Sequence, residues 1–155
     1  MDKSKGLYMK IGLVCNMGGH LTEMLFLIEA FDGHDIFFLT YKDPRIENLN
    51  FRKYLVEKIN MSLWKMMKAS FKILIILWNE KPNLIVSTGS EIAIPTFIFA
   101  KLMGIKTIYI ESWCRVTTKS RTGRILYFCS NVFLVQWPDL LKKYGKKAKY
   151  KGGVI

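Results

Sequence analysis

The chain has 155 residues, half of them apolar, and its 24 lysines and arginines against 12 aspartates and glutamates give a formal net charge of +12. A chain of this length forms a single domain, and its apolar fraction excludes a disordered, collagen-like or coiled-coil protein. The positive charge favours a polyanionic partner, which is a nucleic acid, an anionic membrane surface or a phosphorylated substrate.

Short apolar segments alternate with longer amphipathic segments along the chain. Residues 10–15 and 35–39 predict buried strands, and between them apolar side chains recur at helical spacing over 20–31. Residues 54–59 predict a weaker third strand, and 61–79 predict the longest helix, which Pro82 ends. The remaining expected elements are strands over 83–86, 105–110 and 132–135 and helices over 91–103, 121–129 and 138–144.

This alternation predicts an α/β fold, a Rossmann-like doubly wound parallel sheet of about six strands with helices on both faces. A single domain is expected over residues 1–155. Because ligands of such sheets bind beyond the carboxyl ends of the strands, the residues that directly follow each strand form the candidate site.

The segment after the first strand combines two glycines with a histidine. Gly18 and Gly19 let the backbone approach a ligand, and the helix that starts there presents unpaired N–H groups that favour phosphate. The pattern is not the dinucleotide fingerprint, and a plain turn is the alternative. His20 is either a general base against a ligand or a helix-start residue bonded to backbone. Glu23 either orients a ligand or offsets the helix dipole, and His34 is expected to have no role.

Polar side chains also follow later strands. The turn after the fourth strand either binds phosphate or sugar or only caps the next helix, and its residues are Ser87, Thr88, Gly89 and Ser90. Glu111 ends an apolar strand, where an unpaired charge is costly, so it is expected either to face a ligand or to pair with Arg115. Ser112 follows it directly, and Gln136, after the last expected strand, could line the same crevice.

The segment 61–79 has a wider apolar arc than a helix that covers a sheet needs. Its lysines lie on one narrow stripe, and tryptophans with lysine stems suit a membrane interface. We therefore expect a membrane-facing amphipathic helix, and the alternative is a buried crossover helix with one wet edge. The residues expected to face the membrane are Trp64, Lys65, Lys68, Phe71, Lys72 and Trp78.

Three widely spaced cysteines and only two histidines argue against a disulfide framework, a zinc finger or a histidine-rich metal site. Residues 1–8 are polar and do not form a secretory signal peptide, and no uncharged stretch is long enough to predict a spanning helix.

Several short motifs resemble one family when they are taken together. They are the glycine turn with its following Glu23, STGSEIAIP over 87–95, YIESWCRV over 109–116, the S-x-x-G-x-x-L-Y segment over 120–127 and FLVQWP over 133–138. They cover nearly the whole chain in order. The chain resembles the membrane-associated, acceptor-binding subunit of the two-subunit UDP-GlcNAc transferase of N-glycan assembly. It is equally similar to bacterial PssD/CpsF/EpsE-type half-transferases of polysaccharide synthesis.

The resemblance implies the N-terminal half of a GT-B glycosyltransferase, similar to MurG-type enzymes that act on a polyprenyl-diphosphate sugar. It implies that this chain binds the lipid-linked acceptor, while a separate donor-binding subunit holds the UDP-sugar, expected to be UDP-GlcNAc. No cofactor and no metal are expected in this chain. His20 matches the family's glycine-loop histidine and Glu111 its strand-end glutamate, and either is the expected base.

The resemblance also implies a peripheral position at the cytoplasmic face of the membrane. Eukaryotic members carry an N-terminal spanning helix, and this sequence has only residues 1–8 there. We therefore expect a compact prokaryotic member whose membrane contact rests on residues 61–79.

Two other protein classes compete with this interpretation. A nucleic-acid-binding or scaffold protein would use the charge of +12, but the lysines are spread over several segments and no nucleic-acid motif is present, so no nucleic-acid partner is expected. A flavodoxin-like cofactor protein would be coloured when purified.

Overall fold

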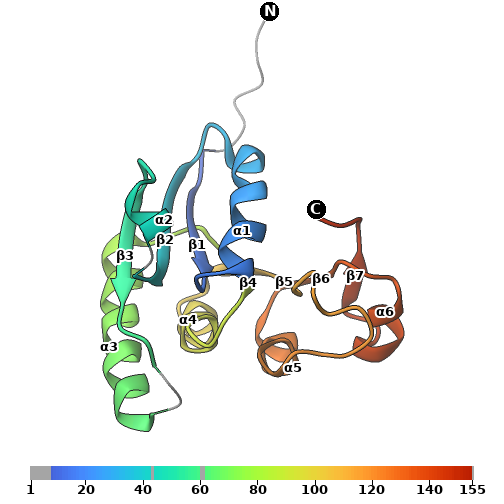
Figure 1. The fold of residues 1–155 in the computed structure, drawn as a ribbon. Helices are drawn as coiled ribbons and strands as arrows, with labels where there is room; N and C mark the ends of the chain where they lie inside the picture. Colours follow the sequence, from blue (N-terminus) through green and yellow to red (C-terminus); the bar gives the residue numbers. More distant parts are fainter. Residues whose placement is uncertain (1–7, 43, 60–61, 155) are drawn as a thin grey trace, which may run out of the picture.

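The computed structural model describes residues 8–42, 44–59 and 62–154, which fold into one parallel β-sheet with helices on both faces (Figure 1). The strands of these residues are β1 Lys10–Cys15, β2 Asp35–Tyr41, β3 Arg52–Val56, β4 Leu84–Gly89, β5 Lys106–Ile110, β6 Val132–Val135 and β7 Ala148–Tyr150. The helices are α1 Gly19–Phe26, the 3-10 helix η1 Ile28–Phe31, α2 Pro44–Glu47, α3 Leu63–Glu80, α4 Ala93–Leu102, α5 Arg121–Cys129 and α6 Asp139–Tyr144.

The sheet has the strand order β3-β2-β1-β4-β5-β6-β7, and each strand pairs in parallel with its neighbours. The chain first adds strands on one side of β1 and then crosses to add β4 to β7 on the other. The order therefore reverses between β1 and β4, whose carboxyl ends lie together where Cys15 is paired with Gly89. This is the doubly wound fold that the alternating pattern predicts, and the fold class is confirmed.

Each face of the sheet has its own apolar core. On one face, Ile73 and Leu77 of α3 and Phe97 of α4 pack in a cluster that includes Leu126 of α5 and Leu140 of α6. On the other face, residues of α1 pack against the sheet. The buried residues of this second core include Leu13, Leu21, Met24, Phe38 and Val86. In Figure 1, α1 accordingly lies on the opposite side of the sheet from α4 and α5, and the first turns of α3 extend beyond the end of β3.

Several elements differ from the sequence-based prediction. The helix expected over 20–31 ends at Phe26 and continues as η1, the third strand lies over Arg52–Val56 rather than 54–59, and α4 begins at Ala93. The short elements α2 and β7 were not expected. The helix expected over 61–79 is α3, although residue 61 lies outside the described residues. It ends at Glu80 because Lys81 has a left-handed conformation, with φ 47°, directly before Pro82.

An ionic cluster fastens the end of α3 to the amino ends of the first strands. The buried carboxylate of Glu80 pairs with Lys10 at 3.1 Å and Arg52 at 3.0 Å and accepts a hydrogen bond from Tyr54. Arg52 also pairs with Asp35 at 2.8 Å. Burial by itself raises the pKa of Glu80, but the hydrogen bonds and the two cations outweigh it, so the pKa lies below its ordinary value.

Candidate functional site

The glycine turn after β1 and the turn after β4 meet at the point where the strand order reverses. Thr88 Oγ1 donates a hydrogen bond to the backbone oxygen of His20 at 2.8 Å. Gly89 has φ +118°, and a Cβ built on it would lie 2.8 Å from His20 Cε1, so only glycine lets the imidazole pack directly on this turn. The structure therefore brings together two motifs that the sequence places about seventy residues apart, as the parallel-sheet topology predicts.

The start of α1 offers groups that suit an anion. Gly18 and Gly19 are exposed, no side chain caps the helix, and its first turn contains no acidic residue. The exposed guanidinium of Arg45 lies beside this turn and donates to Gly18 O at 3.4 Å and to Thr22 Oγ1 at 3.3 Å. Arg45 was not expected at this site, because the helix α2 that carries it has only four residues and no periodic apolar pattern in its sequence.

The imidazole of His20 is half-buried at this turn. Its Nδ1 atom is buried, and none of the described residues gives it a hydrogen-bond partner. Buried polar atoms without a partner are rare in folded proteins, and each one calls for an explanation such as a catalytic role or a bound ligand. Among the described residues, His34 Nδ1 shares this property, so the role of His20 as a site residue stays a prediction.

The hydroxyls of the turn after β4 hold the turn itself. Ser87 Oγ accepts a hydrogen bond from Gly89 N at 3.1 Å, and Ser90 Oγ accepts one from Ile92 N at 3.4 Å, just before α4. Ser87, Thr88 and Ser90 are all buried. Their side chains therefore shape the turn, and it is the backbone of this turn that borders His20. The N-cap of α4 is Ile92, without a hydrogen bond from a described side chain, so Ser90 does not cap this helix as the capping alternative expects.

Glu23, expected to face a ligand, is instead the centre of a buried polar network. Its carboxylate accepts hydrogen bonds from Ser112 Oγ at 2.9 Å, from Trp113 N at 3.2 Å and from Gln136 Nε2 at 3.0 Å. Gln136 Nε2 also donates to Glu111 O at 3.0 Å, and its Oε1 accepts from Val154 N at 2.8 Å. The same residues that were predicted to bind the acceptor thus fasten α1 to the carboxyl ends of β5 and β6.

Glu111 is fully buried, and its partners are not those expected. Among the described residues, its carboxylate accepts hydrogen bonds from the backbone N–H of Ser112, the backbone and hydroxyl of Ser120, and the hydroxyls of Tyr109 and Tyr144. Arg115 is exposed, and no ion pair between described residues joins it to Glu111, so the predicted pairing is wrong. Hydroxyl and amide donors satisfy the charge without a cation.

The pKa values of the two tyrosines reflect this arrangement. Burial first, and then the negative charge of Glu111, raises the pKa of Tyr109 well above its usual value. Burial also raises the pKa of Tyr144, and its hydrogen bond to Glu111 and the charge of that group raise it further. Both phenols therefore remain protonated donors to the carboxylate at neutral pH.

Gly123 completes the enclosure of Glu111. Ser120 caps α5 by accepting a hydrogen bond from Gly123 N at 2.8 Å while its hydroxyl donates to Glu111 at 3.0 Å. A Cβ on Gly123 would overlap Glu111 Oε2 and Tyr144 Oη and would lie 2.8 Å from Ser120 Oγ. In the S-x-x-G motif, the serine thus donates a hydrogen bond to Glu111, and the glycine leaves room for its carboxylate.

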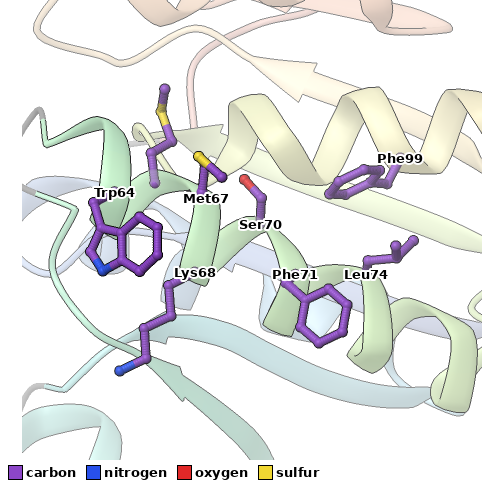
Figure 2. A pocket seen from close by; sticks show the side chains of 8 residues that line it. Trp64, Met67, Lys68, Ser70, Phe71, Leu74 and Phe99 are labelled. Atoms are coloured by element: carbon purple, nitrogen blue, oxygen red, sulfur yellow. The ribbon is translucent and has the colours of Figure 1, made fainter.

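The outer face of α3 is apolar and exposed. Trp64, Met67, Phe71 and Trp78 are each at least 64% exposed, while Ile73 and Leu77 on the opposite side of the helix are buried in the core. Figure 2 shows Trp64, Met67, Phe71 and Leu74 of α3 and Phe99 of α4 around a groove of about 780 Å³. The helix is therefore apolar on two sides, as the wide arc of the sequence indicates.

The lysines of α3 are exposed, but two of them have partners on the β3 side. Lys72 Nζ donates to the backbone oxygen of Leu55 at 2.8 Å, and Lys68 pairs with Glu57 at 3.8 Å. Lys68 and Lys72 therefore border the apolar face on its β3 side, and Lys68 also lines the groove beside Trp64 and Phe71. Membrane contact by these lysines stays a prediction. No helix within residues 8–42, 44–59 and 62–154 is long and apolar enough to cross a membrane.

The described part of the chain contains no group of three or more His, Cys, Asp or Glu side chains that could hold a metal ion. The carboxylates of Glu23 and Glu111 both accept hydrogen bonds from hydroxyl and amide donors of this part of the fold.

The seven-stranded parallel sheet and its covering helices define the fold class, which is that of the N-terminal domain of GT-B enzymes. The structure is similar to MurG of Acinetobacter baumannii with a TM-score of 0.77 at 17% sequence identity, and the match covers 93% of this chain and 46% of that chain. The chain thus spans about half the length of that enzyme.

Sequence comparisons identify the family. A family model described as "Oligosaccharide biosynthesis protein Alg14 like" matches residues 45–154. The UDP-N-acetylglucosamine transferase subunit ALG14 of Homo sapiens is 30% identical over 192 residues, which cover 100% of this chain and 87% of the relative. The corresponding subunit of Schizosaccharomyces pombe is 28% identical over 165 residues, which cover 87% and 78% of the two chains. This chain belongs to the Alg14 family, and the resemblance predicted from its motifs is confirmed.

Proposed function

We propose that this chain is the acceptor-binding subunit of a two-subunit transferase, which adds GlcNAc from UDP-GlcNAc to a sugar carried on polyprenyl diphosphate. Its relatives in the family are UDP-N-acetylglucosamine transferase subunits, which supports both the transfer reaction and the need for a partner. The observation that carries the acceptor role is the position of His20. It lies at the switch point of the sheet, on Gly89, with a buried and unpartnered Nδ1.

The diphosphate of the acceptor binds at the start of α1. The exposed backbone of Gly18 and Gly19, the positive end of the helix dipole and the guanidinium of Arg45 all favour a negative charge there. Because these groups lie at the same turn as His20, a bound diphosphate brings the adjoining sugar to the imidazole.

His20 acts as the general base. The oxygen of an acceptor hydroxyl forms a bond to the anomeric carbon of the donor sugar, the bond from that carbon to the UDP oxygen breaks, and UDP leaves with the electron pair. The hydroxyl proton moves to a ring nitrogen of His20. Glu111 is the alternative base, but five hydrogen bonds from described residues enclose its carboxylate, which supports a positioning role.

The donor-binding subunit meets this chain across the crevice. Its relatives are transferase subunits, which supports a UDP-sugar site on a second chain of the C-terminal type, and we propose no cofactor for this chain. The complex lies at the cytoplasmic face of the membrane, where the exposed apolar face of α3 and its bordering lysines contact anionic lipid.

The test is a transfer assay with UDP-GlcNAc and a short-chain polyprenyl-diphosphate sugar. We expect no turnover by this chain alone, turnover by the chain with its donor-binding partner, and a decrease in kcat of at least about tenfold for His20→Ala in the pair. His34→Ala, at the amino end of β2, is the matched control and keeps wild-type activity. Turnover by the isolated chain would overturn the subunit assignment, and full activity of His20→Ala would transfer the base role to Glu111.

A further inference from the structure

Two tryptophans follow the carboxyl ends of neighbouring strands. Trp113 lies after β5 and Trp137 after β6, and their ring centroids are 4.6 Å apart with an interplanar angle of 48°. Trp137 Nε1 donates a hydrogen bond to Trp113 O at 2.7 Å. Both side chains are half-buried, so each keeps part of its surface open at the edge of the sheet where ligands bind.

The tryptophan pair is attached to the helix that carries His20. Trp113 N donates to Glu23 Oε1 at 3.2 Å, and Gln136, directly before Trp137, donates to Glu23 Oε2 at 3.0 Å. Glu23 lies three residues after His20 on α1, which is about one helical turn or 5 Å along the axis. Through Glu23, the pair is therefore joined to the same helix that carries the imidazole, on the side of β5 and β6.

The attachments make the pair rigid. The indole N–H of Trp137 is hydrogen-bonded to Trp113, and the backbone of Trp113 is bonded to a buried carboxylate. The two rings also pack on each other. Binding a ligand therefore costs little side-chain entropy at this pair. The segment that follows, 114–118, is exposed. Neither tryptophan belongs to the two apolar cores, which other residues of β5 and β6 fill. The pair is therefore not explained by core packing alone.

A sugar ring fits this surface chemically. The faces of an indole are electron-rich, and one face of a pyranose presents C–H groups with partial positive charge, so the two pack together without competing for hydrogen bonds. The hydroxyls at the ring edge then remain free to meet a general base.

We propose that Trp113 and Trp137 form the platform for the sugar of the acceptor. This inference rests on the proposed function, because it places the sugar between the diphosphate at α1 and the partner subunit. Packing on the platform fixes the orientation of the ring, and thereby selects which hydroxyl faces His20. The platform is thus a specificity element for a pyranose, separate from the groups that hold the phosphate.

The experiment measures binding of two probes to the full-length chain by isothermal titration. One is a short isoprenyl diphosphate, and the other is the same molecule carrying GlcNAc on its terminal phosphate. The wild type should bind the sugar-bearing probe more tightly, and Trp113→Leu should remove about threefold to tenfold of that preference while binding of the sugar-free probe is unchanged. Trp113→Phe should keep most of the preference, and Phe128→Leu, at an exposed aromatic residue of α5, is the control.

Each other outcome contradicts the inference. An unchanged preference in both Trp113→Leu and Trp137→Leu would show that the sugar does not touch the platform. An equal loss of affinity for both probes would show that the tryptophans only support the phosphate site or the fold. Circular dichroism spectra of the variant and the wild type distinguish these two, and either result contradicts the platform. If the wild type binds neither probe, the proposed function itself fails and this inference fails with it, whereas binding of both probes without a sugar preference overturns the platform alone.

Discussion

Replacing Gly123 by alanine tests whether the enclosure of Glu111 stabilises the fold. Alanine in place of glycine normally stabilises a helix by about 1 kcal/mol. In α5 the added Cβ would overlap Glu111 Oε2 and Tyr144 Oη and crowd the capping hydroxyl of Ser120 at 2.8 Å. The structure therefore predicts the opposite sign from helix propensity.

The magnitude follows from three terms. Overpacking costs about 1–3 kcal/mol. Displacing a buried carboxylate from one of its donors adds about 1–3 kcal/mol. The gain in helix propensity returns about 1 kcal/mol, so Gly123→Ala should be less stable by about 1–5 kcal/mol, against the usual 5–15 kcal/mol of a domain.

Urea unfolding followed by circular dichroism measures this change as a lower midpoint at unchanged slope. Arg124→Ala, at the exposed next position of the same helix, should stay within about 0.5 kcal/mol of the wild type. Tyr144→Phe removes one of the two overlapping oxygens, so it should destabilise the alanine variant less than it destabilises the wild type. A Gly123→Ala protein as stable as the wild type, or more stable, would refute the enclosure as described.

Three further predictions concern pH and membrane contact. Burial, followed by the charge of Glu91, raises the pKa of Tyr41 to about 12. The contribution of this phenol to stability is therefore complete below pH 10 and is lost as the pH rises from 10 to 12. In thermal melts at alkaline pH, Tyr41→Phe should lose less stability than the wild type over that window, and equal losses would contradict this prediction. The lowered pKa of Glu80 gives the reverse case: its contribution to stability is present above about pH 4.5 and is lost as the pH falls through the pKa of the folded state. The free energy of unfolding of Glu80→Gln should therefore fall less steeply with acid than that of the wild type. An unchanged slope would count against the ionic cluster. Cosedimentation with anionic liposomes should fall severalfold for Trp64→Ser combined with Phe71→Ser, while Tyr150→Ser on the edge strand changes nothing; unchanged binding of the folded double variant would exclude this face.

Much of the fold follows from the apolar pattern alone. The strands over residues 10–15 and 132–135 are predicted to the residue, because each is a short apolar run inside the sheet, almost fully buried in the first and buried at alternate residues in the second. The strand β7 was missed because Ala148–Tyr150 has only three residues and no apolar run, and it forms through backbone pairing with β6. Its stability comes from the neighbour rather than from its own side chains.

The candidate site was predictable in its position but not in its contacts. Topology places the turns with His20 and Gly89 side by side, since both follow strands at the reversal of the sheet. Nothing in sequence spacing shows that Glu111 takes its donors from Ser120 and Tyr144 rather than from the nearby Arg115. Likewise, Glu23 and Gln136 were correctly placed at one edge, but their bond to each other depends on side-chain geometry across two elements.

The reversal between β1 and β4 also has a consequence for how the protein folds. The hydrogen bond from Thr88 to the backbone of His20 joins residues 68 positions apart, and the one from Gln136 to Glu23 joins residues 113 apart. Contacts of such separation close large loops, and they form late because the entropy of closure is lost before the contacts compensate for it. A nascent chain can form β1, α1 and β2 early, but the contacts that join α1 to the carboxyl ends of β4 and β6 wait until those strands have left the ribosome. A protein that recognises this edge of the sheet can therefore bind only after β6 has been synthesised.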